Sequence, residues 1–464
     1  MNHFLSICFG LILFSTAWGN VALPLDREAI DEDYLDYFLY VATKKGEAGK
    51  IDKYVALGAT VNAVYDGGYT PLHIAANHNY PEVIGVLIKH DATIDYQSDA
   101  GVTALIVGSR QRAEEAVGAL IDGGAGVDLV DSDGFSALHY AVLAQSGAIA
   151  GMLIDADATV DMREPREQCT PLFLAVRFDN PSFVQRLIDA GADAALVDVY
   201  GYTVLHSAAY YGYADVVAVL IAEKADVLAS NDEGMLPLHV GARADHAPVV
   251  QLLLNAGTPV DVKTLKGATA LHYAIQQGSA SVTEVLLAAK ADTNLLVQGD
   301  LTPLSLAVMR GRVDLARLLI DAGASVIVMV PVRFLDLLQI EDAMNLAKLK
   351  KMNQAPGGQN GRNDGFSLLH VPAAQGNLEV LHLLLDANAP TDGATQQGYT
   401  PMHVAAQKGH EAIVGALLDA DADPCLRNDR GETPQEVAHR KGKQAVANML
   451  GAAAVCDPVF RDEL

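Results

Sequence analysis

Basic side chains are scarce in this sequence. Its 464 residues include 32 Lys and Arg against 57 Asp and Glu, which gives a net charge of −25 at pH 7. Nucleic-acid binding depends on Lys and Arg side chains that neutralise phosphates, so such a surface would repel a phosphate backbone. The same charge opposes docking on anionic lipid. We therefore expect no nucleic-acid partner.

Aromatic residues are also few, at 6% of the chain, although half of the residues are hydrophobic. The abundance of Ala, Leu, Val, Gly and Asp suits thin helices packed through small side chains better than a β-sandwich or a disordered chain. A chain of this length exceeds one ordinary core. It indicates either several domains or one repeat array.

Long apolar segments are lacking. The apolar run from Phe4 to Phe14 is too short to span a bilayer comfortably, and small residues follow it at Ala17 and Gly19. Residues 1–19 are therefore predicted to be a signal peptide, with a buried N-terminal helix as the alternative, and residues 20–33 an acidic lead-in. No later segment has the length and apolar character of a membrane span.

The last four residues are Arg461, Asp462, Glu463 and Leu464. They resemble the K-D-E-L class of endoplasmic-reticulum retrieval signals, with Arg keeping the positive charge of Lys. In a eukaryote, these ends predict a protein of the endoplasmic-reticulum lumen that binds a retrieval receptor through its tail. In a bacterium, they would indicate a secreted or periplasmic protein.

A phrase of the form Gly-x-Thr-Pro-Leu-His returns at near-constant spacing. It begins at Gly68, Gly101, Gly134, Gln168, Gly201, Gly234, Gly267, Asp300, Gly365, Gly398 and Gly431. The step is 33 residues, except 34 from Gly134 to Gln168 and 65 from Asp300 to Gly365. A second phrase, such as residues 187–193, closes each unit. The period and both phrases resemble the ankyrin repeat over roughly residues 34–454.

The resemblance implies an all-α repeat solenoid of about 11–13 ankyrin repeats, each a helix–turn–helix with a β-hairpin loop. In each unit Thr caps the first helix, Pro occupies its first turn and Gly ends the second helix. Stacked units would share one core. We expect an array with a degenerate N-terminal cap at 34–331, a degenerate repeat or helical insertion with a flexible loop at 332–364, C-terminal repeats and a cap at 365–454, and a tail at 455–464.

Three cysteines remain after the predicted signal peptide, namely Cys169, Cys425 and Cys456. Because three is odd, at least one thiol stays unpaired or pairs between chains. Cys425 and Cys456 lie close enough in the repeat order to form a disulfide in an oxidising lumen. The sequence leaves that pairing open.

Seven histidines recur at one position of the unit: His73, His139, His206, His239, His272, His370 and His403. They lie a full repeat apart, too far to share a metal ion without further ligands. We interpret them as hydrogen-bonding within and between repeats. No catalytic motif or phosphate-binding loop occurs, so we expect no enzyme activity, no cofactor and no metal site. Weak calcium association through net charge is an alternative.

Hairpin tips and first-helix positions contact partners in proteins that the sequence resembles. At those positions the chain offers Arg177, Phe178, Tyr200, Tyr202, Tyr210, Tyr211, Met235 and Arg243. Exposed aromatic and Arg side chains supply much of the energy of protein interfaces. We expect a protein or peptide partner in the concave groove, with packing of the tyrosines against neighbouring repeats as the alternative. The predicted function is a non-catalytic scaffold or adaptor in the secretory pathway.

Overall fold

The computed structural model describes residues 32–297, 301–331, 365–453 and Cys456. The predicted signal peptide at 1–19 and nearly all of the acidic lead-in lie outside the described residues. The retrieval signal at Arg461–Leu464 lies outside them as well. So does the predicted degenerate repeat or helical insertion at 332–364.

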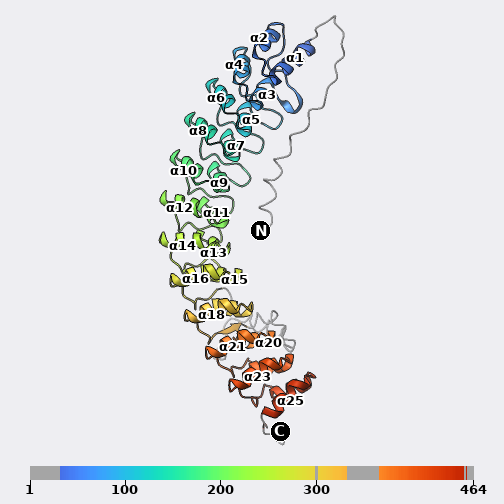
Figure 1. Cartoon of the computed structure of the whole chain (residues 1–464), viewed down its shortest axis with the longest axis vertical. Coiled ribbons are helices and arrows are strands. Elements are labelled where there is room, and N and C mark those ends of the chain that lie inside the picture. The colour runs from blue at the N-terminus through green and yellow to red at the C-terminus, as the bar shows by residue number, and fades with distance from the viewer. Residues whose placement is uncertain (1–31, 298–300, 332–364, 454–455, 457–464) are drawn as a thin grey trace, which may run out of the picture. The chain divides into compact units, whose positions relative to one another are not determined.

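Twenty-four α-helices form twelve helix–turn–helix pairs in the described part of the chain (Figure 1). The first helices of the pairs are α1 (Glu32–Lys44), α3 (Pro71–Asn77), α5 (Ala104–Gln111), α7 (Ala137–Leu143), α9 (Pro171–Val176), α11 (Val204–Tyr211), α13 (Pro237–Arg243), α15 (Ala270–Gln277), α17 (Pro303–Met309), α20 (His370–Gln375), α22 (Pro401–Lys408) and α24 (Pro434–Arg440). The second helices are α2 (Ala48–Ala56), α4 (Pro81–Lys89), α6 (Glu114–Asp122), α8 (Gly147–Asp155), α10 (Pro181–Asp189), α12 (Ala214–Ala222), α14 (Ala247–Asn255), α16 (Ala280–Ala288), α18 (Val313–Asp321), α21 (Leu378–Asp386), α23 (Glu411–Asp419) and α25 (Gln444–Ala453). A short 3₁₀ helix, η2, spans Asp66–Gly68. The predicted all-α solenoid is confirmed.

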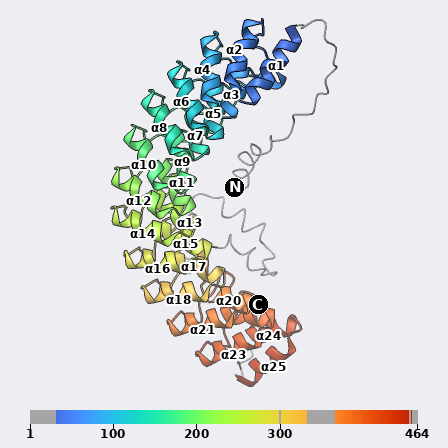
Figure 2. The ribbon, with the colours of Figure 1, turned by 45° about the horizontal axis from the view of Figure 1, so that its top comes forward.

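The chain divides into two compact units, Met1–Ser132 with Gly151–Ala156, and Asp133–Ala150 with Asp157–Leu464. In the first unit α3 packs against α5, and α4 against α6. In the second unit the first helices stack as one layer and the second helices as another, from α9 and α10 to α24 and α25 (Figures 1 and 2). Each helix pair buries its apolar face against the adjacent pairs of the stack. A single pair therefore has no core of its own.

Each first helix is defined by the residues at its two ends. In α22, the Thr400 hydroxyl accepts the backbone N–H of His403, and Pro401 takes the first helical position, where its missing N–H costs nothing. Gly409 ends the helix at φ +84°, a left-handed conformation that favours glycine. The methyl groups of Ala405 and Ala406 are fully buried and let neighbouring first helices approach closely.

The N-terminal pair, α1 and α2, covers the start of the first unit. Leu39 and Ile51 are fully buried as α1 packs on α3 and α2 on α4. Phe38 stacks on Tyr54 with ring centroids 5.7 Å apart and stays 40% exposed. The pair covers α3 and α4, and α1 begins at Glu32, two residues before the expected start of the array at 34.

Segment 332–364 is bracketed by two short strands, β1 (Met329–Pro331) and β2 (Gly365–Ser367), which pair antiparallel. On either side of the strands, α17 packs against α20 and α18 against α21. The stack is therefore continuous between the described repeats that flank this segment.

A recurring hydrogen bond, here called a rung, ties the loop after one second helix to the loop of the next repeat. In each rung a side-chain Oδ1 accepts a backbone N–H at 2.8–3.0 Å, usually 31 residues further on. The pairs are Asn62 with Thr93, Asp95 with Gly126, Asp161 with Asp193, Asp261 with Asp292, Asn294 with Ser325, and Asp392 with Asp423. Acidic residues in these loops thus serve the stacking of repeats.

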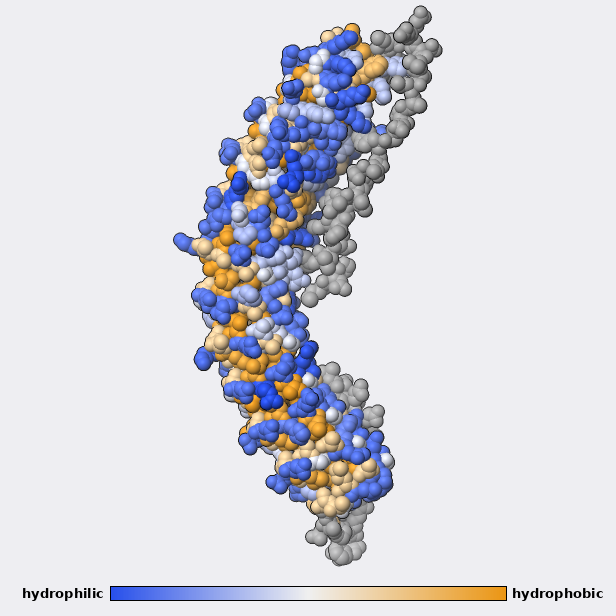
Figure 3. All heavy atoms as spheres, in the orientation of Figure 1, coloured by the Kyte–Doolittle hydropathy of each residue, from blue (hydrophilic) through white to orange (hydrophobic). Residues whose placement is uncertain are grey.

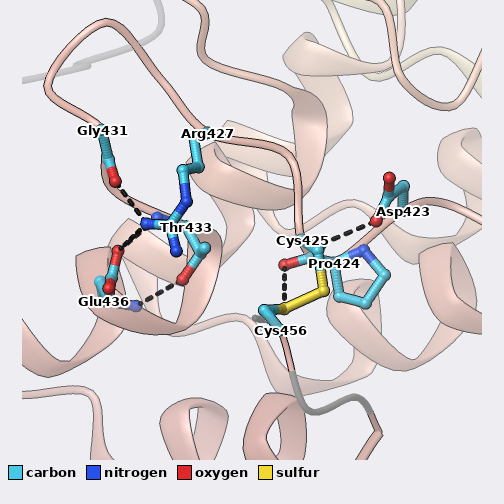
Figure 4. The surroundings of a disulfide bond; sticks show 8 residues. All are labelled: Asp423, Pro424, Cys425, Arg427, Gly431, Thr433, Glu436 and Cys456. Carbon is cyan, nitrogen blue, oxygen red and sulfur yellow. Dashed lines mark hydrogen bonds and ion pairs between the residues drawn. A yellow bond between two sulfur atoms is a disulfide. The ribbon is translucent and has the colours of Figure 1, made fainter. Parts of the chain in front are cut away.

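The last rung position holds a disulfide. Cys425 stands 33 residues after Asp392 and is bonded to Cys456, whose Cα lies 5.3 Å away and 31 residues further on, which is the usual rung spacing. Figure 4 shows the pair beside Pro424, with the Cys425 backbone N–H donating to Asp423 Oδ1 at 2.8 Å. The pairing that the sequence left open is therefore formed, and Cys169 is the free cysteine among the described residues.

Removing the disulfide should loosen the last repeat. A cross-link over a loop of this length stabilises by about 3–4 kcal/mol, and Cys425→Ser with Cys456→Ser supplies no rung in its place. We expect amide protection in α25 to fall by two to three orders of magnitude in hydrogen-exchange measurements, with α3–α6 unchanged because a solenoid opens locally from its ends.

The matched control is Cys425→Asp with Cys456→Ser. This variant restores the polar acceptor of the other rungs, and residue 456 keeps its backbone N–H. It should recover about 1 kcal/mol relative to the Ser/Ser variant. Equal α25 protection in the wild type and the Ser/Ser variant would contradict the assignment.

Candidate protein-binding site

The recurring histidines join each first helix to the following repeat. In the second unit, the backbone N–H of Thr203 donates to His206 Nδ1 at 3.1 Å, so this nitrogen is an acceptor and the proton is on Nε2. Nε2 then donates to the carbonyl of Met235 at 2.9 Å. The same bridge runs from His73 to Val102, from His239 to Val262, from His272 to Leu295, from His370 to Tyr399 and from His403 to Glu432. The predicted structural role is confirmed for these histidines.

Burial keeps these imidazoles neutral. It lowers the pKa of His206, His272 and His370 from the usual 6.5 to about 4, although the hydrogen bond from each ring to a backbone carbonyl opposes the shift. Burial also lowers the pKa of His73, His239 and His403. Within the described ranges, no group of three His, Cys, Asp or Glu side chains is arranged to hold a metal ion.

The predicted partner-binding residues all lie in the second unit and form two groups. Around the hairpin loops, Arg243 extends back along α13, so that Nη2 donates to Tyr202 Oη at 3.4 Å and Nη1 approaches Met235 Sδ at 3.4 Å. Tyr202 also packs edge-on against His206. Tyr200, by contrast, is 52% exposed at the tip of its loop.

The prediction of Met235 as an exposed contact residue is wrong. Its side chain is fully buried, and its backbone carbonyl receives the His206 bridge. Met235 directly follows Gly234 of the loop. At this repeat that position is buried, and the Met235 side chain lies against Arg243. A partner cannot reach it without unfolding the loop.

The second group lies at the turns between first and second helices. The ring of Tyr211 packs edge-on against Tyr210 and stacks on Tyr213, whose hydroxyl donates to the Arg177 carbonyl at 3.3 Å. Phe178 and Tyr210 stay 37% and 43% exposed. The alternative of tyrosines packed against neighbouring repeats thus holds for Tyr202, which is bonded to Arg243 of the next repeat. Tyr211 packs on rings of its own repeat, and Tyr200 and Tyr210 remain accessible.

Sequence reasoning missed a series of exposed aliphatic side chains in the following loops. Together with the α10–α11 loop they form the hairpin row, defined as Val197, Val199, Tyr200, Leu228, Leu265, Leu296 and Ile327. Leu265 and Ile327 are 78% and 76% exposed. Among the described residues from 366 onward, no large hydrophobic side chain is as exposed as those of the hairpin row. The signal available in the sequence was an aliphatic residue at the rung position, where Leu228 and Ile327 replace Asp or Asn.

Charge accompanies the hairpin row. The described loops that carry it between α10 and α17 contain eight acidic residues and four lysines: Asp193, Asp198, Glu223, Asp226, Asp232, Glu233, Asp261 and Asp292, and Lys224, Lys263, Lys266 and Lys290. Burial raises the pKa of Asp198, and the nearby Asp232 charge adds to the shift, against hydrogen bonds from the backbone N–H groups of Tyr202 and Tyr200. Figure 3 shows hydrophobic residues interleaved with hydrophilic ones along the face that it displays.

The free thiol of Cys169 lies near this surface. Burial, with the charges of Glu167 and Glu164, raises the pKa of Cys169 to about 12. The sulfur therefore stays protonated at neutral pH and is a poor nucleophile.

Helix pairs stacked at a 33-residue period, with loops linked by His bridges and rungs, define a class of repeat proteins that bind other proteins. The chain belongs to the ankyrin-repeat family: a model of three ankyrin repeats matches residues 39–131, 153–231, 172–264, 238–329, 340–428 and 369–459, which together span more than half of the chain. A comparison with curated proteins gives no match. No helix in the described ranges is long and apolar enough to cross a membrane.

Among solved structures, the chain is similar to the ankyrin repeat domain of Bcl-3, a member of the IκB protein family. The sequences are 27% identical over 47% of this chain and 97% of that one, with a TM-score of 0.44. Proteins built from ankyrin repeats are in general non-catalytic interaction proteins, and this chain has the interaction domain of that family.

The buried histidines predict a stability that falls with acid. Each of His206, His272 and His370 is neutral in the folded state down to pH about 4 but binds a proton near pH 6.5 when unfolded. Their contribution is therefore complete above pH 6.5 and is lost between pH 6.5 and 4, at about 1.4 kcal/mol per pH unit for each residue. We expect the melting temperature, followed by circular dichroism, to drop from pH 7.5 to pH 5.

His206→Gln serves as the comparison, because glutamine can still donate to the Met235 carbonyl but does not titrate. Over this interval the variant should take up about one proton fewer on unfolding than the wild type does. Its free energy of unfolding should therefore fall less steeply with acid. A melting temperature that stays constant from pH 7.5 to pH 5 in the wild type would contradict the neutral, buried histidines.

Proposed function

We propose that this chain is a non-catalytic adaptor of the secretory pathway, which binds a protein or peptide partner on the hairpin loops and first-helix ends of its second unit. The observation that carries the proposal is the hairpin row, together with the accessible Tyr200, Tyr210 and Phe178. Scattered exposed apolar side chains are ordinary on a soluble surface. Side chains of this size repeated in successive loops are typical of a contact surface for another protein.

One feature of the structure supports the location. The Cys425–Cys456 disulfide is of a kind that persists in oxidising compartments and is rare in the reducing cytosol. The proposal takes residues 1–19 as a signal peptide and Arg461–Leu464 as a retrieval signal, which would place the adaptor in the endoplasmic-reticulum lumen.

The location is tested by expressing the full chain, and a variant lacking residues 461–464, in secreting eukaryotic cells. We expect the full chain to stay in the cells, because the retrieval receptor returns it, and the truncated variant to appear in the medium. Immunoblots of cells and medium measure the distribution. Secretion of both would leave a secreted adaptor, and failure of both to enter the pathway would contradict the signal peptide.

The binding surface is tested by a photo-crosslinking amino acid placed at Tyr210 in the full chain in the same cells. We expect a discrete adduct with another protein, since Tyr210 is exposed and adjoins the packed Tyr211. The matched control places the crosslinker at Val64, which is 53% exposed in the first unit. Adducts of equal yield and pattern at both positions would show non-specific contact and contradict the proposed surface.

A further inference from the structure

We propose that the hairpin row takes an extended segment of a partner protein that combines apolar side chains with Lys or Arg. This inference rests on the proposed function and specifies its partner. It concerns the four loops that follow α12, α14, α16 and α18, each of which exposes one large aliphatic side chain: Leu228, Leu265, Leu296 and Ile327.

The spacing of these side chains fits an extended chain. Leu228 and Ile327 occupy the same position in loops three repeats apart, 99 residues along the sequence. Packed helices are about 8–10 Å apart, so the four loops cover about 30 Å. An extended chain advances about 3.3 Å per residue, so about nine residues would cross all four loops. The side chains on one face of such a segment recur about every 6.6 Å, so the four or five that face the row span about the same distance as the four aliphatic contacts.

Stacking of the repeats does not account for Leu228. At the rung position of its loop, Leu228 has no oxygen to accept a hydrogen bond, and Pro259, at the donor position opposite, has no backbone N–H. The preceding loop has Ala195 at this position, so its rung is missing as well. In the repeats that have the rung, the same position holds Asp or Asn and binds the next loop. The aliphatic replacements are half or more exposed, and contact with a partner gives them a role.

Charge selects among partners. The described loops between α10 and α17 contain eight acidic residues against four lysines, and Lys266 already lies 3.4 Å from Glu233. An acidic segment would be repelled, whereas Lys or Arg side chains of a partner would meet carboxylates on either side of the aliphatic contacts. A second copy of this chain carries the same charge of −25 and is disfavoured for the same reason.

The test uses fluorescent synthetic peptides of about ten residues with alternating Lys and Leu, alternating Glu and Leu, or alternating Lys and Ser, matched to the length estimated for the segment. Anisotropy titrations with the purified protein measure the dissociation constants at several salt concentrations. We expect the Lys–Leu peptide to bind at least ten-fold more tightly than either of the others, because it alone satisfies both the aliphatic and the acidic parts of the surface.

The row variant combines Leu228→Gln, Leu265→Gln and Ile327→Gln. It should bind the Lys–Leu peptide at least ten-fold more weakly than the wild type does. Its melting temperature should be unchanged, because these side chains are exposed. The matched control, Leu57→Gln with Val64→Gln, changes exposed side chains of the first unit and should bind like the wild type. Equal affinity for the Lys–Leu and Lys–Ser peptides, or for the row variant and the wild type, would overturn the inference. So would concentration-dependent self-association through the row in analytical ultracentrifugation.

The crosslinking experiment at Tyr210 separates this inference from the proposed function. If the cellular adduct persists in the row variant and the Lys–Leu peptide shows no preference for the row, the adaptor function stands and the hairpin row is not the contact. If the wild type gives no specific adduct at Tyr210, the proposed surface itself is wrong, whatever the peptides show.

Discussion

The hydrogen bonds that join one repeat to the next are the constraint on which the structure depends. A helix pair of this size cannot bury its own apolar face, so the fold exists only as a stack. The histidine bridge from one first helix to the next loop, as from His206 to Met235, fixes the position of each loop relative to its neighbour. Rungs between loops add a second contact on the same side. These two kinds of bond hold the loops together. Exposed loop side chains that take no part in them are not needed for stacking and are available to bind a partner.

At the C-terminal end of the second unit, a disulfide takes the place of the hydrogen bond between loops. In the last described repeat Cys425 replaces the polar rung residue, and its bond to Cys456 ties that residue, just after α25, to the loop between α23 and α24. In the first unit α1 and α2 cover α3 and α4 with aromatic and aliphatic side chains. Of these two arrangements, the disulfide is the one that depends on an oxidising environment.

The candidate site combines side chains that serve the stack with side chains that do not. Tyr202 and Tyr211 lie between these roles, since each packs on another aromatic ring and is partly exposed. Tyr200, Leu265 and Ile327 are exposed to a degree that stacking does not require. The loops around them are acidic, so their surface favours partners of opposite charge. Binding in this region and the stability of the repeats can therefore be changed separately by substitution.

The sequence by itself determined the repeat, because a 33-residue period with Thr-Pro-Leu-His records local requirements: a helix cap, a proline in the first turn and an apolar packing face. It also located the accessible Tyr200 and Tyr210. Tertiary structure alone decided that Met235 is buried, that Cys425 meets Cys456 and that Leu228, Leu265, Leu296 and Ile327 occupy successive loops. Those outcomes depend on what the adjacent repeat places opposite each residue. A periodic pattern specifies the position of a side chain within its unit but not its neighbour across the stack.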